Sequence, residues 1–197
     1  MDTNELKNTR GSEWRKWDLH CHTPSSYDYQ YKAADADELI ISKLIENEIS
    51  VIAITDHFVI DAAIITSIKE KTSEITVFPG VELRTDKGAA NIHVILIFPE
   101  NTDLSTLKSD FEAIMLRSKA KNNDNNDRIY WDYTDIVDFA QTHNALISLH
   151  TGKKTNGLDK EITNALEVGQ AIKEEYAKTA HIFEIGQVCD IESYNQI

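Results

Sequence analysis

Residues 17–23 read Trp-Asp-Leu-His-Cys-His-Thr and place two imidazoles, those of His20 and His22, at the end of a short apolar segment. Side chains two residues apart on a β-strand point to the same face, so both rings can bind one metal ion. This stretch therefore predicts a strand that ends in a pair of metal ligands.

The same arrangement returns four times downstream, where polar side chains close an apolar run or lie within one. These positions are Thr55-Asp56-His57, Pro79-Gly80-Val81-Glu82, His93 and Ser148-Leu149-His150. In α/β barrels the carboxyl ends of the strands meet at one rim, so side chains at these positions are expected to share a pocket. Only His93 departs from the pattern, because it lies early in its predicted strand.

Strand-like and helix-like periods alternate after a polar lead-in at residues 1–13. The predicted strands are Lys16–His20, Val51–Thr55, Ile75–Phe78, Ile92–Phe98, Ala145–Leu149 and His181–Ile185. Predicted helices cover Ile41 to Ile49, Leu104 to Ile114, Tyr133 to Thr142 and Lys160 to Lys178. The alternation indicates βαβ units around a parallel sheet or barrel, and hence one α/β domain over residues 14–197.

Composition limits the possible functions. The net charge of −13 over 197 residues argues against broad binding to nucleic acid or to anionic membranes, which needs a basic face. The two cysteines, Cys21 and Cys189, show neither the spacing of a thiolate zinc site nor a disulfide framework, which favours a reducing cytoplasm. No apolar stretch approaches the roughly 20 residues of a membrane span, so a soluble protein is expected.

Taken together and in this order, the five motifs resemble those of the PHP (polymerase and histidinol phosphatase) metal-dependent phosphoesterases, over roughly residues 14–190. Residues 11–17 and 152–157 are similar to the PHP domains at the front of large TrlF-like ATPases. The resemblance implies a distorted seven-stranded (β/α) barrel that holds two or three divalent ions (Zn, Mn or Fe) and hydrolyses phosphate esters with metal-activated water.

The resemblance also implies a set of ligands. His20 and His22 would bind the first ion together with Glu82, which also bridges to the second ion. His93 and His150 would complete the second site, and His57 with Asp28 would hold a third ion. The family's late Asp-x-His pair is not visible before Ile197. Either the closing strand lies in residues absent from this chain, or the site is incomplete.

Four further side chains receive roles around this site. Asp56 is expected to orient an imidazole rather than to bind an ion. Arg84, Lys153 and Lys154 follow ligand-bearing positions and are candidates to clamp a phosphate.

Two functions follow from the sequence. The first is a phosphoesterase acting on a nucleotide or a nucleic-acid end, with an ATPase domain or chain as partner. The alternative is a catalytically inactive PHP domain that serves as a scaffold for a partner or for a C-terminal ATPase.

Overall fold

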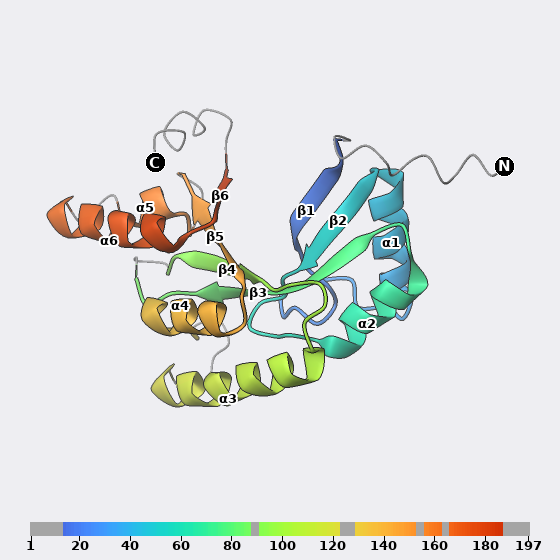
Figure 1. The fold of residues 1–197 in the computed structure, drawn as a ribbon, viewed down its shortest axis with the longest axis horizontal. Coiled ribbons are helices and arrows are strands. Elements are labelled where there is room, and N and C mark those ends of the chain that lie inside the picture. Colours follow the sequence, from blue (N-terminus) through green and yellow to red (C-terminus); the bar gives the residue numbers. More distant parts are fainter. Residues whose placement is uncertain (1–13, 88–90, 123–128, 153–155, 163–165, 187–197) are drawn as a thin grey trace.

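The computed structural model describes residues 14–87, 91–122, 129–152, 156–162 and 166–186. Within them, one sheet holds six strands in chain order: β1 (Lys16–Cys21), β2 (Ile49–Ile54), β3 (Thr76–Arg84), β4 (His93–Ile97), β5 (Leu146–Thr151) and β6 (Ile182–Ile185). The sheet curls into a half-barrel (Figure 1). The α/β class is therefore confirmed, while the seventh strand stays a prediction.

Helices cover the outer side of the curled sheet (Figure 1). They are α1 (Ala36–Glu46), α2 (Ala62–Lys71), α3 (Leu104–Asn122), α4 (Tyr133–Thr142), α5 (Leu158–Ile162) and α6 (Leu166–Thr179). The prediction of one helix from Lys160 to Lys178 is wrong, because two helices occupy this stretch. No sequence prediction covers α2, although Asp61 caps it by accepting hydrogen bonds from the backbone N–H groups of Ala63 and Ile64.

The direction of β4 corrects the prediction of a parallel sheet. β1, β2 and β3 are parallel, as are β5 and β6, but β4 is antiparallel to both β3 and β5. Only residues 85–92 join β3 to β4, and a parallel connection needs about a dozen residues or more. The start of β4, where His93 pairs with Arg84, therefore lies at the same rim as the carboxyl ends of the other strands. This explains why His93 is early in its strand.

The two faces of the sheet carry different side chains. On β3, Val77, Val81 and Leu83 are buried in the large core that the helices complete. Phe78, on the opposite face of the strand, belongs to a smaller apolar layer inside the half-barrel, where it packs with Leu19, Ala53, Ile95, Ile97 and Ile182. Glu82 shares the face of Phe78 because it lies four residues further along. The inner face is thus apolar at one end and polar at the rim.

The two edge strands of the half-barrel, β1 and β6, face each other across a groove of about 420 Å³. Residues 17–20 of β1, Ser148 of β5 and residues 182–185 of β6 line it. Because His20 and Glu184 are among these residues, the groove reaches the polar end of the inner face.

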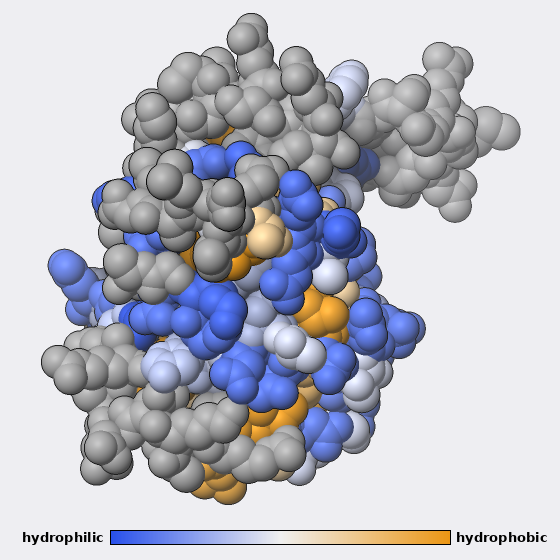
Figure 2. Space-filling view, turned by 90° about the vertical axis from the view of Figure 1, so that its left-hand side faces the viewer, coloured by the Kyte–Doolittle hydropathy of each residue, from blue (hydrophilic) through white to orange (hydrophobic). Residues whose placement is uncertain are grey.

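Hydrophilic side chains dominate the described surface in Figure 2, and the hydrophobic ones form small separate patches. This agrees with the net charge of −13. Among the described helices, none combines the length and the apolar character that crossing a bilayer requires.

Candidate metal centre

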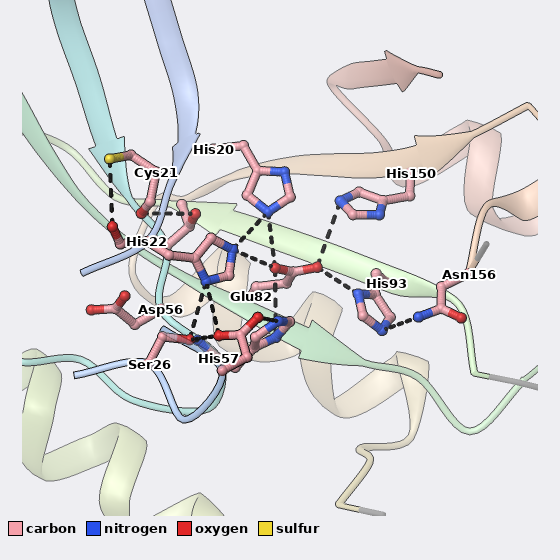
Figure 3. Close-up of polar contacts among 12 residues, drawn as sticks. His20, Cys21, His22, Ser26, Asp56, His57, Glu82, His93, His150 and Asn156 are labelled. Carbon is pink, nitrogen blue, oxygen red and sulfur yellow. Dashed lines mark hydrogen bonds and ion pairs between the residues drawn. The ribbon is translucent and has the colours of Figure 1, made fainter. Parts of the chain in front are cut away.

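Imidazoles from four strands and their following loops converge on one buried carboxylate (Figure 3). That carboxylate belongs to Glu82 of β3, which is only 1% exposed. The rings around it are those of His20, His22, His57, His93 and His150. Their positions in the chain span 130 residues, so the curl of the sheet is what brings them together.

One oxygen of Glu82 forms a nearly equilateral triangle with the two histidines of β1 and its following loop. Glu82 Oε2 lies 2.9 Å from His20 Nε2 and 3.1 Å from His22 Nε2, and these two nitrogens are 3.0 Å apart. Ligand atoms at 2.0–2.1 Å from a tetrahedral ion lie about 3.3 Å from one another. The three atoms therefore fit three corners of a cation site.

The other oxygen of Glu82 faces a second pair of rings. Glu82 Oε1 lies 2.5 Å from His93 Nδ1 and 3.6 Å from His150 Nε2. Both histidines are buried, with side chains 8% or less exposed. Because the two carboxylate oxygens face different histidines, Glu82 can bridge two cations.

A third group lies beside the first and includes an exposed carboxylate. Asp28 Oδ2 is 3.4 Å from His57 Nε2, and Asp28 Oδ1 is 3.7 Å from His22 Nδ1. The other ring nitrogen of His57, Nδ1, is buried and has no hydrogen-bond partner among the described residues. It lies 3.5 Å from Glu82 Oε2. A buried ring nitrogen without a hydrogen-bond partner fits the role of a metal ligand.

Charges at the centre are strongly coupled. Burial raises the pKa of Glu82, but hydrogen bonds with His20, His22 and His93 outweigh the burial and hold this pKa well below its ordinary value. Burial lowers the pKa of His20, but hydrogen bonds with Glu184 and Glu82 raise it from 6.5 to about 10. Burial lowers the pKa of His57 to about 4. The bound proton of His20 therefore offsets part of the negative charge of Glu82 and Glu184.

Asp56 has a contact other than the expected one. Its buried carboxylate accepts hydrogen bonds of 2.5 Å from both the backbone N–H and the hydroxyl of Thr23. Burial raises the pKa of Asp56 to about 6, against the effect of these two bonds. Asp56 thus fixes the loop directly after His22, rather than binding an imidazole.

Of the three predicted phosphate-binding cations, the structure describes one. Arg84 lies on the face of β3 that carries Glu82, is 8% exposed and donates a hydrogen bond to the hydroxyl of Tyr27. Its guanidinium also lies over the rings of Tyr27 and Phe58, at 5.7 and 5.5 Å from their centroids. Lys153 and Lys154 lie outside the described residues.

Three polar side chains at the centre were missed by reasoning from the sequence. Glu184 lies 3.0 Å from His20 Nδ1, Ser26 Oγ is 3.1 Å from His22 Nδ1, and the side-chain amide of Asn156 is 2.7 Å from His93 Nε2. A usable sequence pattern exists only for Glu184. It is the acidic residue of the predicted strand His181–Ile185, in a position equivalent to that of His150 on the neighbouring strand.

Comparison with known proteins supports the fold. The chain resembles an amidohydrolase from Chromobacterium violaceum, solved with sulfate and without metal, at 12% identity and a TM-score of 0.54, over 85% of this chain and 76% of that one. It also resembles a two-domain protein from Bacteroides vulgatus that contains a predicted PHP-like metal-dependent phosphoesterase, at 16% identity and a TM-score of 0.51. That match covers 86% of this chain and 43% of the Bacteroides protein.

A third similar structure is that of a Bifidobacterium adolescentis protein provisionally assigned as a metal-dependent phosphoesterase. It matches at 12% identity and a TM-score of 0.50, over 87% of this chain and 86% of that one. No family model matches the chain, and no curated protein matches it significantly. At identities this low, the structural likeness shows only that the chain shares its fold with these three proteins.

Proposed function

We propose that the chain is a PHP-type phosphoesterase that hydrolyses a phosphate ester at two or three divalent ions of zinc, manganese or iron. The observation that carries the proposal is the convergence of five imidazoles on the two oxygens of Glu82. A buried carboxylate surrounded by so many ring nitrogens is costly to fold unless cations or protons hold the groups together. Mixed nitrogen and oxygen ligands suit those three metals.

The geometry suggests how the ligands are divided. His20, His22 and Glu82 Oε2 would hold the first ion, because these three atoms lie within 3.1 Å of one another. His93 and His150 would hold the second ion with Glu82 Oε1. His57 and Asp28 would hold a third ion beside the first.

Divalent ions in such a centre supply a bound water of lowered pKa and neutralise the charge that develops on a phosphoryl group. The chain's own residues keep the ligands in place. Asp56 holds the loop behind His22 through Thr23, and Glu82 fixes the spacing between the two sides of the centre. No side chain of the protein is required as the nucleophile.

For the substrate, we propose a small phosphate ester, such as a nucleotide or the end of a nucleic-acid strand. The net charge of −13 disfavours extended contact with a duplex, whereas one phosphate needs only a local cation. Arg84 supports this, because it lies two residues after Glu82 on the same face of β3. This phosphate-binding type of side chain donates a hydrogen bond to Tyr27, and the ring centroid of Tyr27 is 5.0 Å from that of His57.

The narrower likeness, to the PHP domains of TrlF-like ATPases, also stays a proposal. Residues 11–17 and 152–157, which carry it, lie partly outside the described residues. An ATPase partner is therefore a prediction from the sequence alone.

Metal content and hydrolysis test the proposal together. The protein is reconstituted with Mn²⁺, Zn²⁺ or Fe²⁺, and bound metal is measured by mass spectrometry. Hydrolysis of bis(p-nitrophenyl) phosphate, of nucleoside monophosphates and of an end-labelled oligonucleotide is then assayed. We expect at least two ions per chain and metal-dependent release of product.

Two variants sharpen this test. Glu82→Gln keeps the size of the side chain but removes its charge and one acceptor oxygen, so it should lose both bound metal and hydrolysis. Glu100→Gln changes an exposed carboxylate in the turn after β4 and should behave like the wild type. A folded wild type that binds no metal would exclude the proposed centre. Bound metal without hydrolysis of any of these substrates would instead favour the scaffold function.

A further inference from the structure

Glu184 of β6 lies outside the predicted ligand set, yet it contacts two of its members. Its Oε2 is 3.0 Å from His20 Nδ1 and 3.3 Å from His150 Nε2. On the sheet, Glu184 is the direct neighbour of His150 in the β5–β6 pair. Its contact with His20 instead crosses the groove that separates β6 from β1. One carboxylate thus links the two edges of the half-barrel at the rim.

On His20, the nitrogen that Glu184 contacts is not the one that faces Glu82, whereas on His150 both carboxylates face Nε2. The two nitrogens of an imidazole point in different directions, so one ring cannot direct both at the same ion. Nε2 of His20 belongs to the triangle with His22 and Glu82 Oε2. Nδ1 therefore points away from that triangle, and an acceptor there keeps the proton on Nδ1 and the lone pair of Nε2 free.

His20 has more need of such a contact than the three buried rings, as does His22, whose side chain is 21% exposed. His20 lies on an edge strand beside an open groove, and its side chain is 24% exposed. The side chains of His57, His93 and His150 are 8% or less exposed, so packing restricts their rotation. On the groove side of His20, the hydrogen bond with Glu184 restricts the rotation of the ring, as packing does for the buried rings.

The outer nitrogens of two other rings have neutral groups at hydrogen-bond distance, and the charged Asp28 lies farther from His22 Nδ1, at 3.7 Å. His22 Nδ1 contacts the hydroxyl of Ser26, and His93 Nε2 contacts the amide of Asn156. A carboxylate is the strongest acceptor of the three and raises the basicity of the ring most.

We propose that Glu184 is a positioning residue for the metal centre: it accepts the Nδ1–H of His20, orients that ring across the groove and leaves Nε2 to bind the first ion. This inference rests on the proposed metal centre but not on the identity of the substrate. Outer carboxylates of this kind change metal affinity by about 10- to 100-fold. The effect should fall on the ion that His20 holds.

The test compares Glu184→Gln and Glu184→Ala with the wild type, and Glu100→Gln is the charge control. Co²⁺ is titrated into each metal-free protein against a chelator, which gives the number of ions and the affinity of each. We expect unchanged stoichiometry, with the affinity for one ion about 10-fold weaker in Glu184→Gln and about 100-fold weaker in Glu184→Ala. The amide of glutamine can still accept the hydrogen bond, which makes its loss the smaller one.

A second readout does not depend on affinity. In ¹⁵N-labelled, Zn²⁺-loaded protein, the Nδ1–H proton of His20 should resonate far downfield as a proton bonded to a carboxylate, and Glu184→Ala should abolish this resonance. The inference is overturned if Glu184→Ala binds every ion within twofold of the wild type. It is also overturned if that variant loses one ion from the stoichiometry, which would make Glu184 a direct ligand, or if all affinities fall equally together with folding stability.

These outcomes separate the present inference from the proposed function. If the wild type binds Co²⁺ and Glu184 has the expected effect, but no phosphate ester is hydrolysed, the phosphoesterase proposal fails and the role of Glu184 stands. If the wild type hydrolyses substrate and the Glu184 variants bind metal normally, only the role of Glu184 fails. If the folded wild type binds no ion, both fail.

Discussion

Gly80 occupies a position on β3 where any side chain would collide with the backbone of both neighbouring strands. A Cβ atom added to Gly80 would lie 2.8 Å from the carbonyl oxygen of Leu96 on β4 and 2.9 Å from that of Ile54 on β2. It would also lie 2.8 Å from Cγ2 of Thr55. A rotamer change can move the threonine methyl group, but the two carbonyl oxygens are held in the sheet. Gly80→Ala should therefore push β3 away from at least one neighbour.

The expected cost follows from the number of rigid contacts. Overpacking a core by one methyl group typically costs about 1–3 kcal/mol. Because two of the three contacts of Gly80→Ala are with backbone atoms, we expect the upper end, about 3 kcal/mol. For a chain of this size, such a loss corresponds to a fall in Tm of about 6–12 °C. Glu82 lies two residues further along the same face, so metal affinity should fall as well.

Urea denaturation of the metal-free protein, followed by circular dichroism, measures this loss. Thr55→Ser removes the methyl group that causes one of the contacts and keeps the hydroxyl, so it is the matched second variant. The double variant Gly80→Ala/Thr55→Ser should regain less than half of the lost stability. If Gly80→Ala unfolds within about 0.5 kcal/mol of the wild type, or if Thr55→Ser restores it fully, the backbone contacts do not set the cost.

Three further predictions concern the residues around the centre. In a Cys189→Ser variant, iodoacetamide should modify Cys21 at pH 8 about a thousand times more slowly than an ordinary thiol, because burial raises the pKa of Cys21 from 9.0 to about 12; a rate near that of a free cysteine by mass spectrometry contradicts this. Thr23→Val leaves Asp56 with one donor fewer and should lower the free energy of unfolding by about 1–3 kcal/mol in urea, whereas an unchanged midpoint would show that the hydroxyl is dispensable. Mn²⁺ binding at pH 7 should release at least one proton, because the pKa of His20 is about 10 without metal and the ring must be neutral to bind; calorimetric heats that do not vary with the ionisation enthalpy of the buffer would refute this.

Apolar runs predicted where the strands lie better than they predicted which way the strands run. All six predicted strands overlap observed ones, and the helix Tyr133–Thr142 has the predicted bounds. The reversal of β4 depends on the length of the connection after Arg84, which a periodicity argument does not consider. The predicted strand ends at Phe78, whereas β3 continues to Arg84. Polar residues on its inner face interrupt the apolar run in the sequence, although the outer face remains apolar. The direction of a strand thus depends on the length of the connection before it, whereas its position depends on the pattern of apolar residues.

The sequence predicted the residues that meet at Glu82 more completely than it predicted their hydrogen-bond partners. Histidines in short motifs stand out in a sequence because few structural roles demand them at strand ends. Ser26 and Asn156 do not stand out, since such side chains are common in loops. Asp56 stood out for its place before His57, but its direction depends on the turn of the loop, which takes it to Thr23. Hydrogen-bond partners that lie on loops can therefore be identified only from the three-dimensional structure.

The register of β3 connects the stability of the fold to the geometry of the centre. Val77, Val81 and Leu83 are at most 1% exposed beneath the helices, and Glu82 lies between the last two on the opposite face. A slip of one residue would bury Glu82 in that outer core and turn Val81 or Leu83 towards the imidazoles. The apolar side chains that anchor the strand thus also hold the carboxylate at the rim. Substitutions that loosen this outer core should therefore weaken metal binding, even though these side chains lie on the face of β3 opposite the imidazoles.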